Sequence, residues 1–342
     1  MNHLKKKNVV VLCAGTGGSQ LLSGLKTYPM NLSAVVNVTD NGGASKEIRE
    51  SLFLPQPGDS RKCMSALFSK SASSDQRALQ NFFSYRFGRG ALKGLSMGNF
   101  MLAAFAEMDS SRRLSQGIAR ASTMLALDGT VIPVTDESRQ ICARCVDGTV
   151  ICGEWKIITR SPRVKIATVF LNKRATAVSS ALEAVHKAEV LFIAPGSLYT
   201  GIIPLFLMGG MKSALCASRA KKIWVANVLS QPGLTDEMTI ARHILEIEKY
   251  AKVLLDCVVV NTGLVSHALL RHYKKFGADV LQEGDIPARM SVVRADCIES
   301  HVAQSARTEK ARGEGFEKWK QWSHLLRHDS IKLGRALKIF LQ

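Results

Sequence analysis

Short apolar runs alternate with amphipathic stretches along most of the chain. The runs are rich in valine and isoleucine, as buried strands are, and the stretches between them repeat with the period of a helix. The predicted strands are Val9–Leu12, Ala34–Val38, Val164–Leu171, Val190–Ile193, Ile223–Val228 and Val253–Val260. The predicted helices are Gln20–Leu25, Arg61–Phe68, Asn99–Glu107, Ala175–Lys187 and Thr239–Tyr250. This alternation predicts an α/β protein, a Rossmann-like three-layer domain whose mostly parallel sheet has helices on both faces.

Two regions break the alternation. The segments 140–146 and 149–155 meet at Asp147-Gly148, a pair typical of tight turns, and predict a β-hairpin excursion beside the main sheet. After Ala303 the chain becomes charged and helical, which predicts a C-terminal helical tail. Because no repeat or linker interrupts the chain, we predict a single domain over residues 1–342, with residues 305–342 as a basic helical tail packed on it.

The composition is that of a globular protein with a sizeable core. Of 342 residues, 46% are hydrophobic and 22% are charged, which excludes wholesale disorder. The stretch 190–211 carries no charge, but Pro195-Gly196, Gly201 and Pro204 interrupt it, so we predict no membrane span. The first residues do not resemble a signal peptide, and eight cysteines are too few for a disulfide scaffold. We therefore expect free thiols in a reducing cytoplasm.

The net charge of +18 points to anionic ligands. The basic residues are scattered and are not interleaved with aromatic residues, so a nucleic-acid groove is the less favoured alternative.

A glycine loop follows the first predicted strand. It reads Gly15-Thr16-Gly17-Gly18-Ser19 and leads into a helix, whose free N–H groups and dipole favour phosphate. Gln20 replaces the glycine that a dinucleotide fingerprint requires, and no Gly-Lys-Ser/Thr follows as in a P-loop. The loop predicts anion binding, and a plain tight turn remains the alternative.

Five further polar loops precede helices or follow strands. They are Thr39-Asp40-Asn41-Gly42-Gly43, Pro57-Gly58-Asp59-Ser60-Arg61, Gly98-Asn99, Pro195-Gly196-Ser197-Leu198-Tyr199-Thr200 and Asn227-Val228-Leu229-Ser230-Gln231. Because ligands of open α/β sheets bind at the carboxyl ends of strands, we predict one crevice there. Asp40 could accept from a sugar hydroxyl, hold a metal ion or cap a helix, whereas Asp59 is placed as an N-cap and Arg61 as a fork for phosphate or carboxylate.

Other catalytic arrangements are not supported. Cys142 and Cys145 are three apart on a predicted strand and so face opposite sides, which disfavours a shared metal ion with Cys152. The histidines have no metal-ligand spacing, and no Gly-x-Ser-x-Gly elbow is present.

Taken together, these motifs resemble the gluconeogenesis factor family, from the superfamily of 2-phospho-L-lactate transferase. The resemblance covers nearly the whole chain. Its marks are Gly15-Thr16-Gly17, Leu21-Leu22, Gly24-Leu25, Thr39 to Gly43, Tyr85-Arg86-Phe87-Gly88, Gly98-Asn99, Ile132-Pro133, Gly153-Glu154, Pro195 to Thr200, Gln231-Pro232-Gly233 and Arg327-His328-Asp329. It implies a cytoplasmic regulatory protein that binds UDP-N-acetylglucosamine and links carbon flow to cell-envelope precursor supply and cell shape.

The chain departs from the family pattern at several motif positions. Non-family residues stand at Cys13, Ala14, Lys46, Lys62, Leu95 and Ala194. Side chains in place of glycine narrow the approach of backbone to ligand, and the lysines add charge beside the predicted phosphate site. Asn41 stands where many relatives have a second aspartate, which disfavours metal-assisted transfer.

The predicted site combines these loops into one ligand-binding crevice without catalytic residues. The predicted ligand contacts are Gly15, Thr16, Gly17, Ser19, Asp40, Asn41, Asp59, Arg61, Gly98, Asn99, Pro195, Gly196, Ser197, Tyr199, Thr200, Asn227 and Arg327. Asn227 and Arg327 are assigned to the sugar or the uracil. The first alternative is a transferase of phosphoryl-linked groups with a divalent metal ion at Asp40. A homodimer and a protein partner in cell-envelope precursor synthesis are left open.

Overall fold

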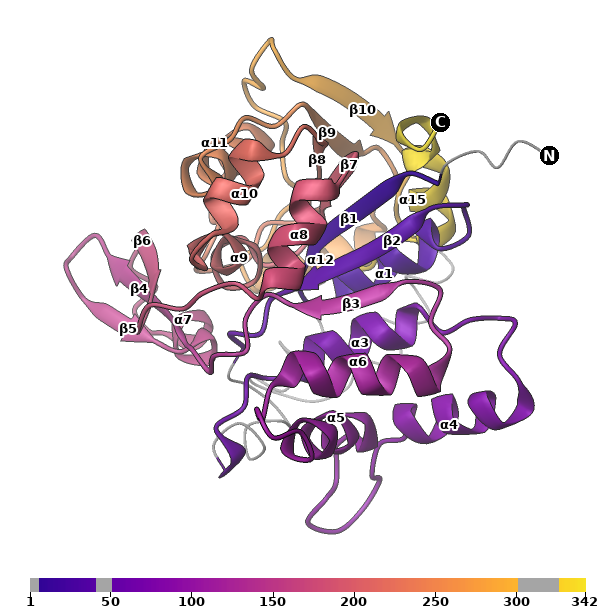
Figure 1. Ribbon diagram of the computed structural model, residues 1–342. Coiled ribbons are helices and arrows are strands. Elements are labelled where there is room, and N and C mark those ends of the chain that lie inside the picture. The colour runs from indigo at the N-terminus through magenta and orange to yellow at the C-terminus, as the bar shows by residue number, and fades with distance from the viewer. Residues whose placement is uncertain (1–5, 41–50, 301–325) are drawn as a thin grey trace.

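A seven-stranded parallel sheet forms the centre of the protein, with strand order β10-β9-β8-β7-β1-β2-β3 (Figure 1). The computed structural model describes residues 6–40, 51–300 and 326–342. The strands of this sheet are β1 (Asn8–Cys13), β2 (Asn31–Val36), β3 (Thr130–Pro133), β7 (Val190–Ile193), β8 (Lys221–Val225), β9 (Cys257–Asn261) and β10 (Ser291–Ala295). The predicted α/β class and parallel sheet are confirmed, whereas the sequence pattern missed the short strands β3 and β10.

Helices cover both faces of this sheet, as predicted. Figure 1 shows α8, α9, α10 and α11 on one face, and α1 and α15 on the other. The helices are α1 (Gly15–Leu25), α3 (Gly58–Ala66), α4 (Ser74–Ser84), α5 (Met97–Glu107), α6 (Leu114–Leu125), α7 (Glu154–Thr159), α8 (Ser179–Lys187), α9 (Ile203–Leu207), α10 (Met211–Ala217), α11 (Ile240–Ala251), α12 (His267–Lys275) and α15 (Ser330–Leu337), with a π-helical turn η2 (Leu198–Ile202) and a 3₁₀ turn η3 (Lys338–Phe340).

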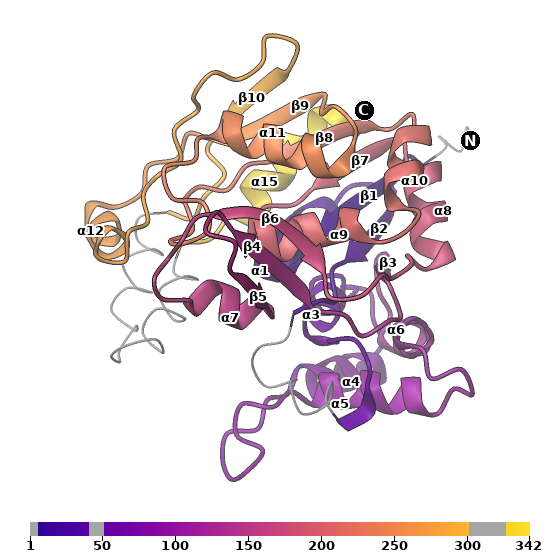
Figure 2. The same cartoon turned by 90° about the vertical axis from the view of Figure 1, so that its left-hand side faces the viewer.

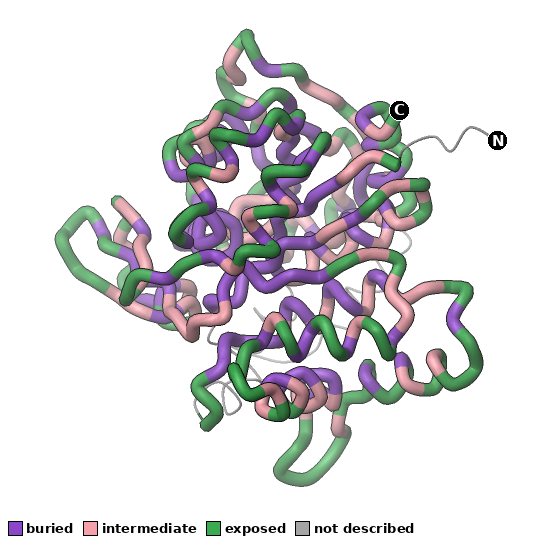
Figure 3. Tube along the Cα trace, viewed as in Figure 1, coloured by how far each residue is buried: buried purple, intermediate pink, exposed green. Residues whose placement is uncertain are grey.

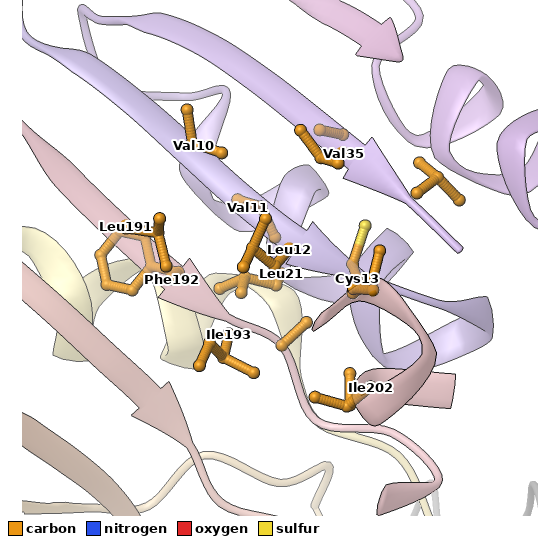
Figure 4. Packing of buried hydrophobic residues seen from close by; sticks show 14 of the residues in the cluster. Val10, Val11, Leu12, Cys13, Leu21, Val35, Leu191, Phe192, Ile193 and Ile202 are labelled. Carbon is orange, nitrogen blue, oxygen red and sulfur yellow. The ribbon is translucent and has the colours of Figure 1, made fainter. Parts of the chain in front are cut away.

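The core is built from strands that are buried on both faces. Figure 3 shows the central strands as buried over most of their length. In Figure 4, Val11 of β1 and Phe192 of β7 belong to the same buried cluster as Leu21 of α1. This explains why β1 and β7 appear in the sequence as continuous apolar runs.

The order in which strands are added to the sheet reverses between β1 and β7. From β1 the chain proceeds through β2 and β3 to one edge, and later returns to place β7 on the other side of β1. The carboxyl ends of these two adjacent strands are the usual ligand position in such sheets.

A second sheet has three antiparallel strands in the order β5-β4-β6. It contains β4 (Ile141–Cys145), β5 (Val150–Cys152) and β6 (Ile166–Leu171). The predicted hairpin is confirmed, but its second arm ends at Cys152, because Gly153 at φ 105° turns the chain into α7. Our assignment of 164–171 to the main sheet was wrong, since β6 pairs with β4.

Cys142 and Cys152 form a disulfide across this hairpin, so our expectation that all thiols are free was wrong. The register places the two residues directly opposite each other, with their Cα atoms 4.0 Å apart. Spacing along one strand, which we considered, does not reveal a partner on the neighbouring strand. The other six cysteines are free thiols.

The C-terminal helix α15 packs directly on α1. A Cβ atom at Gly24 would lie 2.2 Å from the carbonyl oxygen of Ser330, and one at Gly334 would lie 2.8 Å from that of Gly24. The two helices therefore approach so closely that only glycine fits. The predicted C-terminal helix is confirmed over Ser330–Leu337, and residues 305–325 of the predicted tail lie outside the described residues.

Within the described parts of the chain, no helix has the length and apolar character needed to cross a membrane.

Candidate functional site

A pocket of about 540 Å³ lies at the carboxyl edge of the main sheet. Its wall includes the loops after β1, β2, β7 and β8, the starts of α3 and α7, and the segment 326–328. Most of the loops that the sequence singled out therefore meet in one place, at the point where the strand order reverses.

The glycine loop forms the middle of the pocket. Gly15 adopts φ +57°, and a Cβ atom at Gly17 would lie 2.0 Å from the carbonyl oxygen of Pro195. The first turn of α1 thus packs directly against the loop after β7. At this turn the N–H groups of the helix have no acceptor within the helix, which favours an anion.

Asp59 holds this loop in place and does not cap its own helix. Its carboxylate accepts from the N–H of Gly15 at 2.7 Å and pairs with the ammonium of Lys62 at 2.9 Å. We predicted an N-cap, but α3 begins one residue earlier, at Gly58, and has no side-chain cap. The negative charge of Asp59 raises the pKa of Lys62.

Asn227 connects the loops after β7 and β8. Its side-chain oxygen accepts from the N–H of Gly196 at 2.9 Å, and its amide donates to the carbonyl of Gly196 at 2.7 Å. The residue lines the pocket as predicted, but both polar ends of its side chain are bonded to the protein. It therefore fixes the shape of the Pro195-Gly196 loop.

Carboxyl groups gather at the β2 end of the pocket. Thr200 donates to Glu154 at 3.0 Å, and its backbone carbonyl accepts from Asn37, which follows β2. Burial, together with the charge and hydrogen bond of Asp40, raises the pKa of Glu154 well above its usual range. Burial and a neighbouring carboxylate both disfavour the charged form of Glu154, which therefore holds its proton to a higher pH than an exposed glutamate.

Two guanidinium groups line the same part of the wall. Burial and the neighbouring Arg86 lower the pKa of Arg61. The Nε atom of Arg61 is buried and has no hydrogen-bond partner. This pair gives the β2 end positive charge beside its carboxyl groups.

The β8 end of the pocket is mostly apolar. Leu229 and Leu326 pack against the buried ring of Tyr273, and all three line the pocket. The hydroxyl of Tyr273 accepts from the N–H of Leu326 at 3.0 Å, which fixes the start of the segment that carries Arg327 and His328.

Most of the predicted site residues lie in the wall of this pocket. Those that do are Gly15, Thr16, Gly17, Asp40, Asp59, Arg61, Asn99, Pro195, Gly196, Ser197, Thr200, Asn227 and Arg327. Their roles as ligand contacts stay predictions. Asn41 lies outside the described residues.

Three predicted residues face elsewhere. The hydroxyl of Ser19 donates to the carbonyl of Thr16 within α1. Gly98 is a packing position, because a Cβ atom there would lie 2.6 Å from the carbonyl oxygen of Phe83. Tyr199 points toward Met238, and its buried hydroxyl has a raised pKa. Strand-to-loop patterns locate a segment but not the direction of each side chain.

Several wall residues were not predicted as site residues. They are Gln20, Gln56, Lys62, Arg86, Glu154, Trp155, Ser230, Gln231, Tyr273 and His328. Arg86, Glu154, Gln231 and His328 do stand in motifs that carried the family resemblance, and this was the available signal. Tyr273 and Trp155 had none, since each reaches the pocket through tertiary packing.

The described residues hold no group of three or more histidine, cysteine, aspartate or glutamate side chains that could bind a metal ion. Asp59 is engaged by Gly15 and Lys62, and Glu154 is bonded to Asp40 and Thr200. The arrangement in this part of the chain therefore does not fit a preassembled divalent-cation site.

Comparisons with known proteins identify the family of this chain. Residues 9–303 match the model of the 2-phospho-L-lactate transferase CofD family. The chain belongs to this family.

Relatives within the CofD family carry the name suggested by the motifs. A putative gluconeogenesis factor of Thermotoga maritima is 35% identical over 331 residues, which cover 96% of this chain and 98% of the relative. A gluconeogenesis factor of Halalkalibacterium halodurans is 37% identical over 279 residues, which cover 81% of this chain and 84% of the relative. A crystal structure of a upf0052 family protein from Bacillus halodurans is similar with a TM-score of 0.83 at 31% identity, over 98% of this chain and 99% of that chain. The predicted resemblance to gluconeogenesis factors is thus confirmed.

Proposed function

We propose that this protein is a gluconeogenesis factor that binds a nucleotide sugar, of the UDP-N-acetylglucosamine type, in the pocket at the carboxyl edge of its sheet. The observation that carries the proposal is the order of chemistry along the pocket. Carboxyl and amide groups line the β2 end, a glycine loop lines the middle, and apolar side chains line the β8 end.

This order matches the parts of a nucleotide sugar. Sugar hydroxyls suit carboxylate and amide partners such as Asp40 and Asn99, and a diphosphate suits the N-terminus of α1. A flat base suits the apolar surface around Tyr273. The volume of about 540 Å³ lies within the range of about 300–1,000 Å³ typical of small-molecule sites.

We assign the protein a regulatory role in the cytoplasm, linking central carbon metabolism to cell-envelope precursor supply and cell shape. This role rests on the family resemblance. It involves a protein partner that senses the ligand-bound state, and a homodimer is compatible with it. The polar groups of the pocket are mostly bonded to one another, which supports ligand binding without turnover.

A second candidate is a transferase of phosphoryl-linked groups. It is favoured by the family model and by the raised pKa of Glu154, which suits general acid–base chemistry. Under this alternative, incubation with a nucleotide substrate and Mg²⁺ yields a transferred group, and Asp40→Asn abolishes the transfer.

The test is thermal stabilisation by a panel of nucleotides. A ligand at about 100 times its dissociation constant stabilises the folded state by about 2.7 kcal/mol, so UDP-N-acetylglucosamine raises the melting temperature. NAD serves as a matched anionic control that should not. If no UDP-sugar at millimolar concentration shifts the melting temperature, the proposal fails.

The nucleic-acid alternative has a different signature. The binding of an oligonucleotide would weaken steeply with salt and regardless of sequence, because it would rest on phosphate contacts to the +18 surface.

A further inference from the structure

His328 is a buried histidine in the wall of the pocket with one ring nitrogen unused. Its side chain is 8% exposed, and its Nε2 atom is buried without a hydrogen-bond partner. A buried polar atom without a partner costs free energy, and a hydrogen bond from a ligand in the pocket would remove this cost.

The other ring nitrogen fixes the protonation of the ring. The imidazole bonds to the backbone carbonyl of Ala226, and because Nε2 has no partner, Nδ1 makes this bond. Burial lowers the pKa of His328 to about 4, so the ring is neutral at physiological pH. A neutral ring that carries its proton on Nδ1 presents a lone pair at Nε2, and Nε2 can only accept a hydrogen bond.

The backbone that carries the ring is anchored on both sides. His328 forms a β-bridge with Ile298, and the N–H of the following residue, Asp329, donates to the carbonyl of Cys297 at 2.9 Å. Asp329 also caps α15 by accepting from the N–H of Lys332 at 2.9 Å. The acceptor is therefore preorganised on the frame of α15 and does not depend on a mobile side chain.

The position of His328 identifies the part of the ligand that it faces. Ala226 directly follows β8, and the neighbouring wall is formed by Leu229, Tyr273 and Leu326. This is the end of the pocket that we assign to the base. It is separated from the carboxyl groups of the β2 end by β7 and β1.

Resting on the proposed nucleotide site, we propose that Nε2 of His328 accepts a hydrogen bond from the ring N–H of a uracil-type base and thereby selects the base. Uracil presents this N–H between two carbonyl groups. Cytosine presents a lone pair at the same ring position, which would face the lone pair of Nε2. A site built around a buried polar partner rejects an analogue that lacks the matching group more strongly than an apolar pocket can.

The experiment compares UDP, CDP and N3-methyl-UDP by calorimetry on the full chain. The wild type binds UDP at least about tenfold more tightly than CDP or N3-methyl-UDP. In His328→Leu, UDP binding falls to the level of N3-methyl-UDP in the wild type, and the preference for UDP disappears. His186→Leu, an exposed histidine on α8, is the matched control and keeps the wild-type preference.

The N3-methyl ligand tests the inference on unmodified protein, so it does not depend on how well a variant folds. His328→Gln gives a second test, because its amide can bond to Ala226 and leave an oxygen for the base, which restores part of the preference. Equal binding of UDP and N3-methyl-UDP by the wild type overturns the inference but leaves the proposed function intact. The absence of any binding of UDP or UDP-N-acetylglucosamine by the wild type overturns both. Loss of affinity for 2′-deoxy-UDP without loss for N3-methyl-UDP also overturns the inference, since Nε2 would then accept from a ribose hydroxyl.

Discussion

At the β2 end of the pocket each carboxyl has a partner within the protein, whereas at the β8 end a buried ring nitrogen has none. Asp59 is bonded to Gly15 and Lys62, and Glu154 to Asp40 and Thr200. A ligand that binds to these carboxyl groups exchanges one hydrogen bond for another and gains little. A ligand at the β8 end completes a missing bond at His328. We therefore expect the β8 end to contribute more to ligand selection than the carboxyl groups of the β2 end do.

The largest effect on nucleotide affinity is expected from a change in the glycine loop, which lies in the middle of the pocket between its two ends. In Gly17→Ala the new Cβ atom would lie 2.0 Å from the carbonyl oxygen of Pro195, so the glycine loop must separate from the loop after β7. We expect more than about a tenfold loss of uridine nucleotide affinity and a melting temperature lower by about 5 °C. Gly88→Ala, a glycine with open space around it, is the control and should match the wild type in both measurements. Wild-type binding by Gly17→Ala would show that the two loops need not touch.

A second variant affects the β8 end alone. Gly334→Ala places a Cβ atom 2.8 Å from the carbonyl oxygen of Gly24 and displaces α15, which follows the segment with Arg327 and His328. We expect about threefold to tenfold weaker uridine nucleotide binding. Alanine stabilises a helix by about 1 kcal/mol relative to glycine, so helix propensity alone would not weaken binding in this variant. If calorimetry shows unchanged affinity, the contact between α1 and α15 does not contribute to nucleotide binding.

A smaller effect is expected from Arg327, which lines the pocket next to His328. Arg327→Lys keeps the charge but removes the planar fork, so we expect about a fivefold loss of uridine nucleotide affinity. Arg335→Lys, at an exposed position of α15, is the matched control. If calorimetry gives equal affinities for the two variants, Arg327 does not contact the nucleotide.

The smallest effect concerns stability at the β2 end. Glu154 has a raised pKa in the folded state, so the folded state keeps a proton that the unfolded chain releases above about pH 4.5. The stability that this group contributes is complete below that pH and is lost as the pH rises toward the pKa of the folded state. Glu154→Gln carries no such loss, and we expect its melting temperature to exceed that of the wild type by about 1–3 °C at pH 8 and to match it at pH 4. A larger gain at pH 4 than at pH 8 would contradict the raised pKa.

The sequence predicted the frame of the site better than its details. The strands beside the glycine loops were recognisable because they are buried on both faces and appear as continuous apolar runs, as in Val190–Ile193. The short strand Thr130–Pro133 was not, since four residues carry too little periodicity. The disulfide partner of Cys142 and the inward position of Tyr273 depend on the register of the hairpin and the packing of α12, and neither leaves a mark in the local pattern.

The contact between Gly24 and Gly334 has a consequence for how the protein is made. The glycine loop starts α1, and α15, much later in the chain, follows the segment 326–328 of the pocket wall. A nascent chain can form β1 and α1 early in synthesis, but α15 can dock only after it has left the ribosome. The pocket wall formed by residues 326–328 is therefore completed late, and a product that lacks α15 would lose the contact that anchors this wall.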